Sequence, residues 1–107
     1  MYSISSLSRE YVMFDVTETV AGETVDPTTE TVEIAAVSPG TKPISTDWKV
    51  AEWETDSTDP DNPTYAARLL IGPGGTVTLS AALWEMWVRF TDNPEVPAKR
   101  AGSLWVF

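Results

Sequence analysis

The chain has 107 residues, the size of one domain that can bury a core without cross-links. It contains neither cysteine nor histidine, which excludes disulfides, thiolate zinc sites and catalytic centres that use either side chain. A formal net charge of −9, from 16 acidic and 7 basic residues, disfavours binding to the phosphate backbone of nucleic acids.

The charge is unevenly distributed along the sequence. Residues 1–61 contain 13 acidic and 3 basic side chains, a net of −10, whereas residues 62–107 contain 3 acidic and 4 basic ones, a net of +1. This asymmetry predicts one strongly negative end or face, whose simplest role is to keep the protein soluble.

The first nine residues have no basic start and no long apolar run, so we expect no signal peptide. No segment approaches the roughly 20 apolar residues of a membrane span, so we expect no contact with a membrane. We predict that residues 1–9 form an N-terminal arm and that residues 10–107 form a single β-sandwich domain.

Short runs of alternating apolar and polar residues, separated by turn-forming residues, predict seven β-strands. In chain order these are Glu10–Val20, Thr31–Val37, Trp48–Glu54, Thr64–Ile71, Thr76–Leu79, Trp84–Thr91 and Gly102–Phe107. Seven such strands in about 100 residues predict an all-β fold, an immunoglobulin-like β-sandwich, with a closed barrel as the alternative.

The loop Thr55–Pro63 is acidic and rich in turn-forming residues. Loop carboxylates can bind calcium, but the spacing here differs from that of an EF-hand, which has a central glycine and a closing glutamate. Asp and Asn also form turns in their own right, so a solvated turn is the favoured of two open interpretations. The residues concerned are Asp56, Asp59, Asp61 and Asn62.

No pattern in the chain predicts catalysis, a cofactor or a metal. Gly72–Gly75 is not followed by the Lys-Ser/Thr pair of a phosphate-binding loop, so it predicts a hairpin turn. Two opposed carboxylates can hydrolyse glycosides, but nothing in the sequence marks two of the acids as buried or opposed. We therefore expect a protein that is not an enzyme and has no small-molecule substrate.

Aromatic residues on outward-facing strand positions suggest a protein interface. In an immunoglobulin-like sandwich the first, last and penultimate strands are neighbours in one sheet, which would bring five large side chains together. A monomer rarely leaves such a patch bare. Either a partner covers it, or the N-terminal segment folds back over it. An arm lying along a neighbouring protein would add two further contacts, so the predicted interface comprises Tyr11, Met13, Trp87, Trp105, Phe107, Ile4 and Leu7.

Four stretches of the sequence resemble one family. They are Trp87–Pro97 with the closing strand from Gly102, the opening Ser3–Val12, Trp48–Trp53 and Gly72–Gly75. Together they resemble small proteins of tailed phages that infect actinobacteria, encoded among the head and head–tail joining genes. The pattern Trp87–Asp92 is also similar to the N-terminal sandwich domain of some phage baseplate proteins. The resemblance implies a virion structural role and carries over no catalytic residue.

From the residues and the resemblance together we expect a virion structural protein, assembled in the host cytoplasm. It would dock on other virion proteins (capsid, portal or connector, or tail) and on copies of itself, at the head–tail connection or on the capsid surface. The alternative is a tail-associated module that binds a carbohydrate or a receptor. A small hydrolase is a third class, which the absence of histidine and cysteine disfavours.

Overall fold

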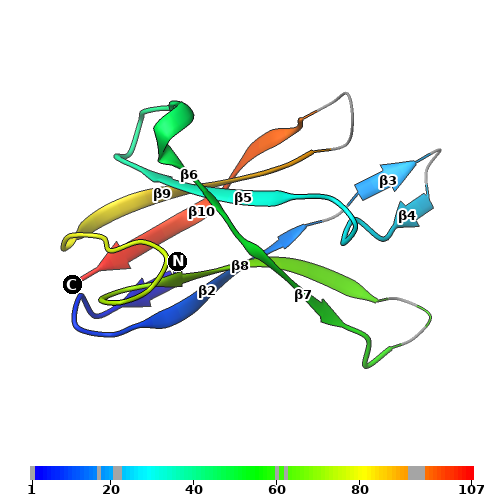
Figure 1. Ribbon diagram of the computed structural model, residues 1–107, viewed down its shortest axis with the longest axis horizontal. Helices are drawn as coiled ribbons and strands as arrows, with labels where there is room; N and C mark the ends of the chain where they lie inside the picture. Colours follow the sequence, from blue (N-terminus) through cyan, green and yellow to red (C-terminus); the bar gives the residue numbers. More distant parts are fainter. Residues whose placement is uncertain (1, 17, 21–22, 60, 62, 92–95) are drawn as a thin grey trace.

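The computed structural model describes residues 2–16, 18–20, 23–59, 61, 63–91 and 96–107, with the backbone alone for 18–20 and 23–25. These residues form an all-β protein of two packed sheets (Figure 1). The strands are β1 (Tyr2–Ile4), β2 (Glu10–Val16), β3 (Glu18–Val20), β4 (Glu23–Val25), β5 (Val32–Val37), β6 (Trp48–Val50), β7 (Glu52–Asp56), β8 (Thr64–Ile71), β9 (Ala82–Phe90) and β10 (Ala98–Val106). One 3₁₀ turn, η1 (Ser45–Asp47), precedes β6.

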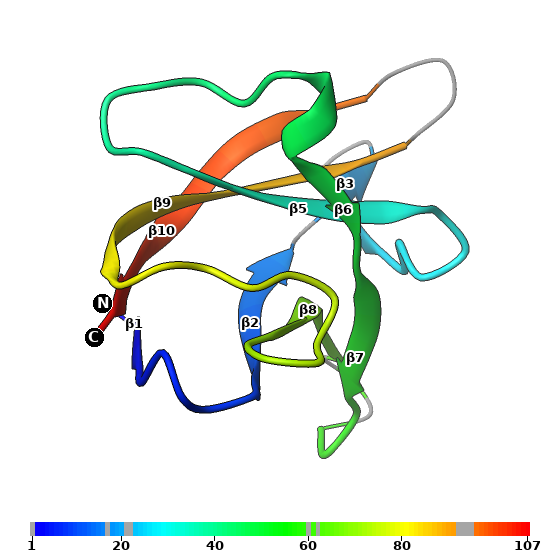
Figure 2. The same ribbon diagram turned by 60° about the vertical axis from the view of Figure 1, so that its left-hand side comes forward.

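The larger sheet has five strands in the order β1-β10-β9-β5-β6, and the smaller has three in the order β2-β8-β7. Strand β1 runs parallel to β10, and every other pair of named strands is antiparallel. Strands β3 and β4 form a separate hairpin, and Figure 2 shows the two main sheets facing each other. The prediction of an all-β fold with two sheets is therefore confirmed.

Alternation of side chains decides which face of each strand enters the core. On β8 the odd-numbered residues from Tyr65 to Ile71 are buried and the even-numbered residues are not. Both sheets contribute fully buried side chains to the core, among them Val12, Ile71, Ile34, Met86 and Leu104. Each such side chain contributes about 1.5–3 kcal/mol by leaving water, so the core accounts for most of the gross stabilisation.

The predicted strand Thr64–Ile71 is correct to the residue, and Thr31–Val37 is correct to within one. The single run predicted for Trp48–Glu54 is wrong, because the chain changes sheets at Ala51. Its first part, β6, pairs with β5 in the larger sheet, whereas β7 pairs with β8 in the smaller one.

The segment that follows β8 also differs from its prediction. No hairpin forms at Gly72–Gly75, because the chain leaves the smaller sheet there and crosses to β9 in the larger one. Residues 76–79 are not a strand, and only an isolated parallel bridge joins Val77 to Ile71.

The N-terminal segment is part of the sandwich. Tyr2–Ile4, predicted to belong to an arm, forms β1 and pairs with Leu104–Val106. Ile4 is only 5% exposed and belongs to the core. Strand β10 begins at Ala98, four residues before the predicted start, and its pairing with β9 shifts between Arg100 and Gly102.

Candidate protein-binding surface

Three segments without a charged side chain converge at one end of the molecule, which we call the uncharged end. They are residues 2–8, 72–84 and 101–107. Pairing of β1 with β10, and of Leu83 with Trp105, joins the segments through the larger sheet. The backbone at Gly72 packs closely against Ser8. Figures 1 and 2 show both termini and the loop after β8 at this end.

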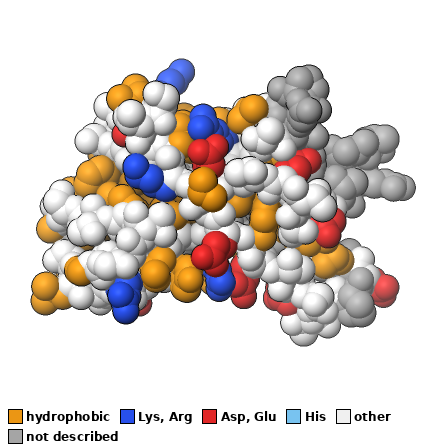
Figure 3. Space-filling view, viewed as in Figure 1, with side chains coloured by type: hydrophobic (Ala, Val, Ile, Leu, Met, Phe, Trp, Pro, Cys, Tyr) orange, Lys and Arg blue, Asp and Glu red, His pale blue; other side chains and the backbone are white. Residues whose placement is uncertain are grey.

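Large apolar side chains lie exposed at the uncharged end. Leu7 is 88% exposed, Phe107 58%, Trp105 45% and Tyr2 38%. Trp105 faces outward because its neighbours Leu104 and Val106 fill the core. In Figure 3 most of the acidic side chains on the visible face lie away from this end.

Backbone hydrogen bonds hold these side chains in place. Ser6 N donates to Phe107 O at 2.7 Å, and Phe107 N donates to Ile4 O at 3.1 Å. The tight turn that presents Leu7 closes with a bond from Ser8 N to Ser5 O at 3.0 Å. The exposed apolar groups are therefore carried on ordered backbone, which lowers the entropy lost when a partner binds.

The predicted interface does not form one patch, because its members lie on opposite outer faces. Tyr11 and Met13 belong to β2 in the smaller sheet, whereas Trp87 and Trp105 belong to β9 and β10 in the larger one. The strand beside β10 is β1, whose residues were predicted to belong to an arm, and β2 lies in the other sheet. Of the predicted residues, the structure brings together Leu7, Trp105 and Phe107, and places Ile4 in the core.

Trp87 lies half-buried on the outer face of the larger sheet, between Ala35 on β5 and Arg100 on β10. Its indole Nε1 is buried and has no hydrogen-bond partner among the described residues.

The charged side chains around Trp87 bind one another: Arg89 binds Glu33 at 3.0 Å and Arg100 binds Glu85 at 3.2 Å. The Arg89 guanidinium also lies 4.3 Å from the ring centroid of Trp48. Around Trp87, therefore, the charged side chains of this face are paired with one another.

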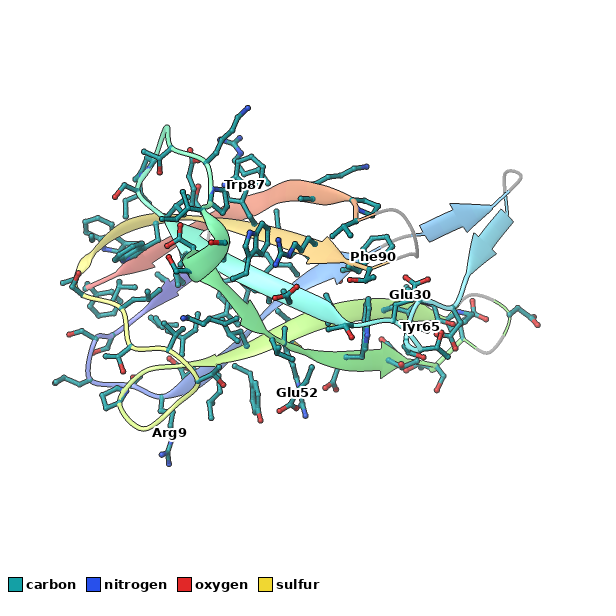
Figure 4. The ribbon with its side chains drawn as sticks, turned by 45° about the horizontal axis from the view of Figure 1, so that its top comes forward. Arg9, Glu30, Glu52, Tyr65, Trp87 and Phe90 are labelled. Atoms are coloured by element: carbon teal, nitrogen blue, oxygen red, sulfur yellow. The ribbon has the colours of Figure 1, made fainter. Side chains whose placement is uncertain are left out.

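The outer face of the smaller sheet is acidic and centres on Arg68. The guanidinium of Arg68 binds Glu52 at 2.8 Å and Glu54 at 2.9 Å, and lies 4.3 Å from the ring centroid of Tyr11. The hydrogen bond to Glu52, with the charges of both glutamates, raises the pKa of Arg68. In Figure 4, Glu52 and Trp87 lie on opposite sides of the sandwich. Tyr11 is thus engaged within its own sheet.

A shallow hollow of about 690 Å³ lies next to this acidic face, lined among others by Met13, Asp15, Glu54 and Asp56. Its ionisable side chains are carboxylates, apart from Tyr65. No group of three or more potential metal ligands occurs in the described part of the chain. We find no arrangement of nucleophile, base and oxyanion donors in it.

The acidic loop forms turns. The Asp56 carboxylate accepts hydrogen bonds from Thr58 N at 3.0 Å and from Thr58 Oγ1 at 2.6 Å, and these bonds lower the pKa of Asp56. Asp61 N donates to the Asp59 carboxylate at 3.1 Å. This is the geometry that the turn interpretation predicts. Asn62, the fourth residue considered for calcium binding, lies outside the described residues.

The uncharged end was not predicted from the sequence, although the absence of charged residues from its segments could have indicated it. Residues 1–8, 72–84 and 101–107 are three of the longer sequence stretches without a charged side chain, together with residues 34–41, in a chain of net charge −9. Their convergence depends on tertiary pairing, which no local pattern encodes. Tyr2 and Leu83 belong to this surface and were not among the predicted interface residues.

No helix among the described residues is long and apolar enough to cross a membrane. No family model, curated protein sequence or solved structure matches the chain.

Proposed function

We propose that this protein is a non-catalytic β-sandwich module that docks on other proteins through its uncharged end, as a structural component of a tailed-phage virion. The observation that carries the docking proposal is the exposure of Leu7, Trp105 and Phe107 on segments that contain no charged side chain, with Arg9 at their border beside Gly74. The centres of protein interfaces are depleted in charged residues and enriched in aromatic ones. Exposed apolar patches on soluble proteins mark such interfaces.

The order of strands supports an immunoglobulin-like type of sandwich. In that fold one sheet contains strands C, F and G, extended by C′ in the variable type, and the other contains B, E and D. Strands β5, β9, β10 and β6 would take the first set of places, and β2, β8 and β7 the second. Strand β1 pairs with the last strand, whereas the constant type places its first strand, A, in the sheet with B, E and D.

The virion role is supported by the resemblance of Ser3–Val12, Trp48–Trp53, Gly72–Gly75 and Trp87–Pro97 to small phage head and head–tail joining proteins, although residues 92–95 lie outside the described residues. A docking module suits such a role, because many copies repeated by symmetry can each contribute a small contact. The protein would then act at the head–tail connection or on the capsid surface.

The test is quantitative mass spectrometry of purified particles assembled with the full-length chain. About a dozen copies would indicate a ring at the neck and hundreds would indicate capsid decoration, and both are consistent with symmetric assembly. Absence of the protein from the particles would refute the virion role.

A matched pair of variants tests the docking surface in the same assay. Trp105→Ser should reduce incorporation about tenfold or more, because it removes an aromatic contact at the centre of the proposed interface. Tyr11→Ser, an aromatic change of similar exposure on the opposite sheet, should leave incorporation unchanged. Equal incorporation of both variants would contradict docking through the uncharged end.

Exposed aromatic rings such as Trp105 also stack on sugars, which keeps a carbohydrate-binding function as the second candidate. Binding of the isolated protein to a glycan array, abolished by Trp105→Ser, would favour that function over docking on virion proteins.

A further inference from the structure

The four edge strands of the two sheets are unequally protected against pairing with another strand. Natural proteins protect sheet edges with very short edge strands, charged side chains, prolines or bulges. On β7, Glu52, Glu54 and Asp56 supply such charges, and on β6 Lys49 does. Strand β2 carries Glu10 and Asp15.

Strand β1 is short, with three residues, but it has no charged side chain or proline to protect its edge. Its residues are Tyr2–Ile4, and among the described strands β10 is its single neighbour. It borders the larger sheet, and the exposed Leu7, Trp105 and Phe107 lie beside it. An incoming strand would therefore gain both backbone hydrogen bonds and apolar burial at this edge.

We infer that β1 pairs with β1 of a second copy of this chain, antiparallel about a two-fold axis, joining two five-stranded sheets edge to edge. This inference rests on the proposed docking function and names a partner for the same surface. With the axis at Ser3, that residue lies opposite the partner's Ser3, and Tyr2 lies opposite the partner's Ile4. This register pairs every residue of β1 and keeps the outward faces of both sheets on the same side.

Side-chain size supports the register. Trp105 is the cross-strand neighbour of Ser3 in the larger sheet. The outward row across the joined sheets would therefore place two small serines between two indole rings, one from each copy. Each indole can lean over the serines and remove its exposed part from water.

The distribution of charge supports a second copy of the chain as the partner that pairs with β1. Two chains of net charge −9 repel each other unless their contact surfaces lie away from the carboxylates. Residues 2–8 and 101–107, which would form the contact, contain no charged side chain. The charges of Arg100 and Glu85 farther along the sheet neutralise each other in an ion pair. Contact through the uncharged end therefore avoids opposing like charges.

The available area indicates a weak dimer. The exposed fractions of Leu7, Phe107, Trp105 and Tyr2 correspond to roughly 450 Å² per copy, taking about 200 Å² for each full side chain. Two copies would bury about 900 Å², below the usual size of a stable interface. We expect monomer at about 10 µM protein and dimer at about 1 mM, with the contact reinforced where copies stand side by side on a particle.

Disulfide trapping tests the register directly, because the natural chain has no cysteine. In Ser3→Cys, the two introduced thiols would face each other across the two-fold axis within reach of a disulfide. Mild oxidation should form the linked dimer about tenfold faster than in Ser38→Cys, which changes another exposed serine, on the loop after β5. Equal rates for the two variants would overturn the proposed pairing.

Sedimentation equilibrium with a charge variant provides the second measurement. Ser3→Lys would place two like charges opposite each other at the axis, so it should abolish the dimer seen at about 1 mM. Ser38→Lys should retain it, and unchanged melting temperatures would show that both variants fold. A natural chain that stays monomeric at this concentration overturns the inference. If Trp105→Ser still loses incorporation into particles in that case, the docking function stands and only the choice of partner is wrong.

Discussion

Gly72 occupies a backbone conformation that other residues rarely adopt, with φ of +129°. Its amide donates to Val77 O at 2.9 Å where the chain crosses between the sheets. A Cβ at this position would overlap the backbone of Ser8 and come within 2.7 Å of Arg9 Cα. Close packing of the loop against the N-terminal segment thus requires glycine.

Gly72→Ala should lower the free energy of unfolding by about 3 kcal/mol or more, because steric overlap adds to the strained φ. Gly40→Ala is the matched control, since Gly40 has φ of +84° but no atom within 4 Å of the added Cβ. The control should cost about 1–2 kcal/mol. Urea denaturation measures both, and equal losses would contradict the close packing at Gly72.

Asp56 gives a pH dependence with a defined sign. The two hydrogen bonds from Thr58 lower the pKa of Asp56 from its ordinary 3.8 in the folded protein. Its contribution to stability is therefore complete above the pKa of the unfolded chain and is lost as the pH falls through the lower folded value. The stability difference between the natural chain and Asp56→Ala should shrink over that acidic range. An NMR titration that places the Asp56 carboxyl at or above 3.8 would contradict this.

At the scale of elements, the sequence predicted a strand best where one run of residues serves one sheet. Strand β8 alternates strictly, β5 is an apolar run that is mostly buried, and both have turn-forming residues at their ends, so local pattern and tertiary pairing agree. In the run Trp48–Asp56 the apolar positions change from even-numbered (Trp48, Val50) to odd-numbered (Ala51, Trp53), and the chain divides between two sheets at this point. Alternation records which face is buried, and it carries no information about which neighbour supplies the hydrogen bonds.

Substitutions in β5 and β6 can test whether the internal strand contributes more to the core than the edge strand does. Ile34 lies in this internal strand and is fully buried, so Ile34→Ala should cost about 2–5 kcal/mol of unfolding free energy. Val50→Ala on the edge strand β6 should cost about 0.5 kcal/mol or less, because Val50 is 66% exposed. Chemical denaturation of the two variants checks the contrast, and a similar loss in both would contradict it.

At the scale of the whole molecule, repulsion among carboxylates should outweigh the attraction within its ion pairs. The net charge is −9, whereas the ion pairs at Arg68, Arg89 and Arg100 lie partly in solvent and are individually weak. Raising NaCl from about 20 mM to about 300 mM shortens the screening length and should raise the melting temperature by a few degrees. Calorimetry measures this shift, and a fall in melting temperature would show that the ion pairs dominate.

The sequence by itself determined the all-β character, the inward faces of the main strands and the acidic turn at Asp56, because alternation and turn propensity are local. It also excluded chemistry that needs histidine or cysteine. Only the tertiary structure decided which exposed aromatic residues lie together. Strand β1 takes the place beside β10, and β2 lies in the other sheet. Tyr11 on β2 is therefore separated from Trp105 on β10. The uncharged end has the same origin, since three segments far apart in the chain meet there through strand pairing and close loop packing.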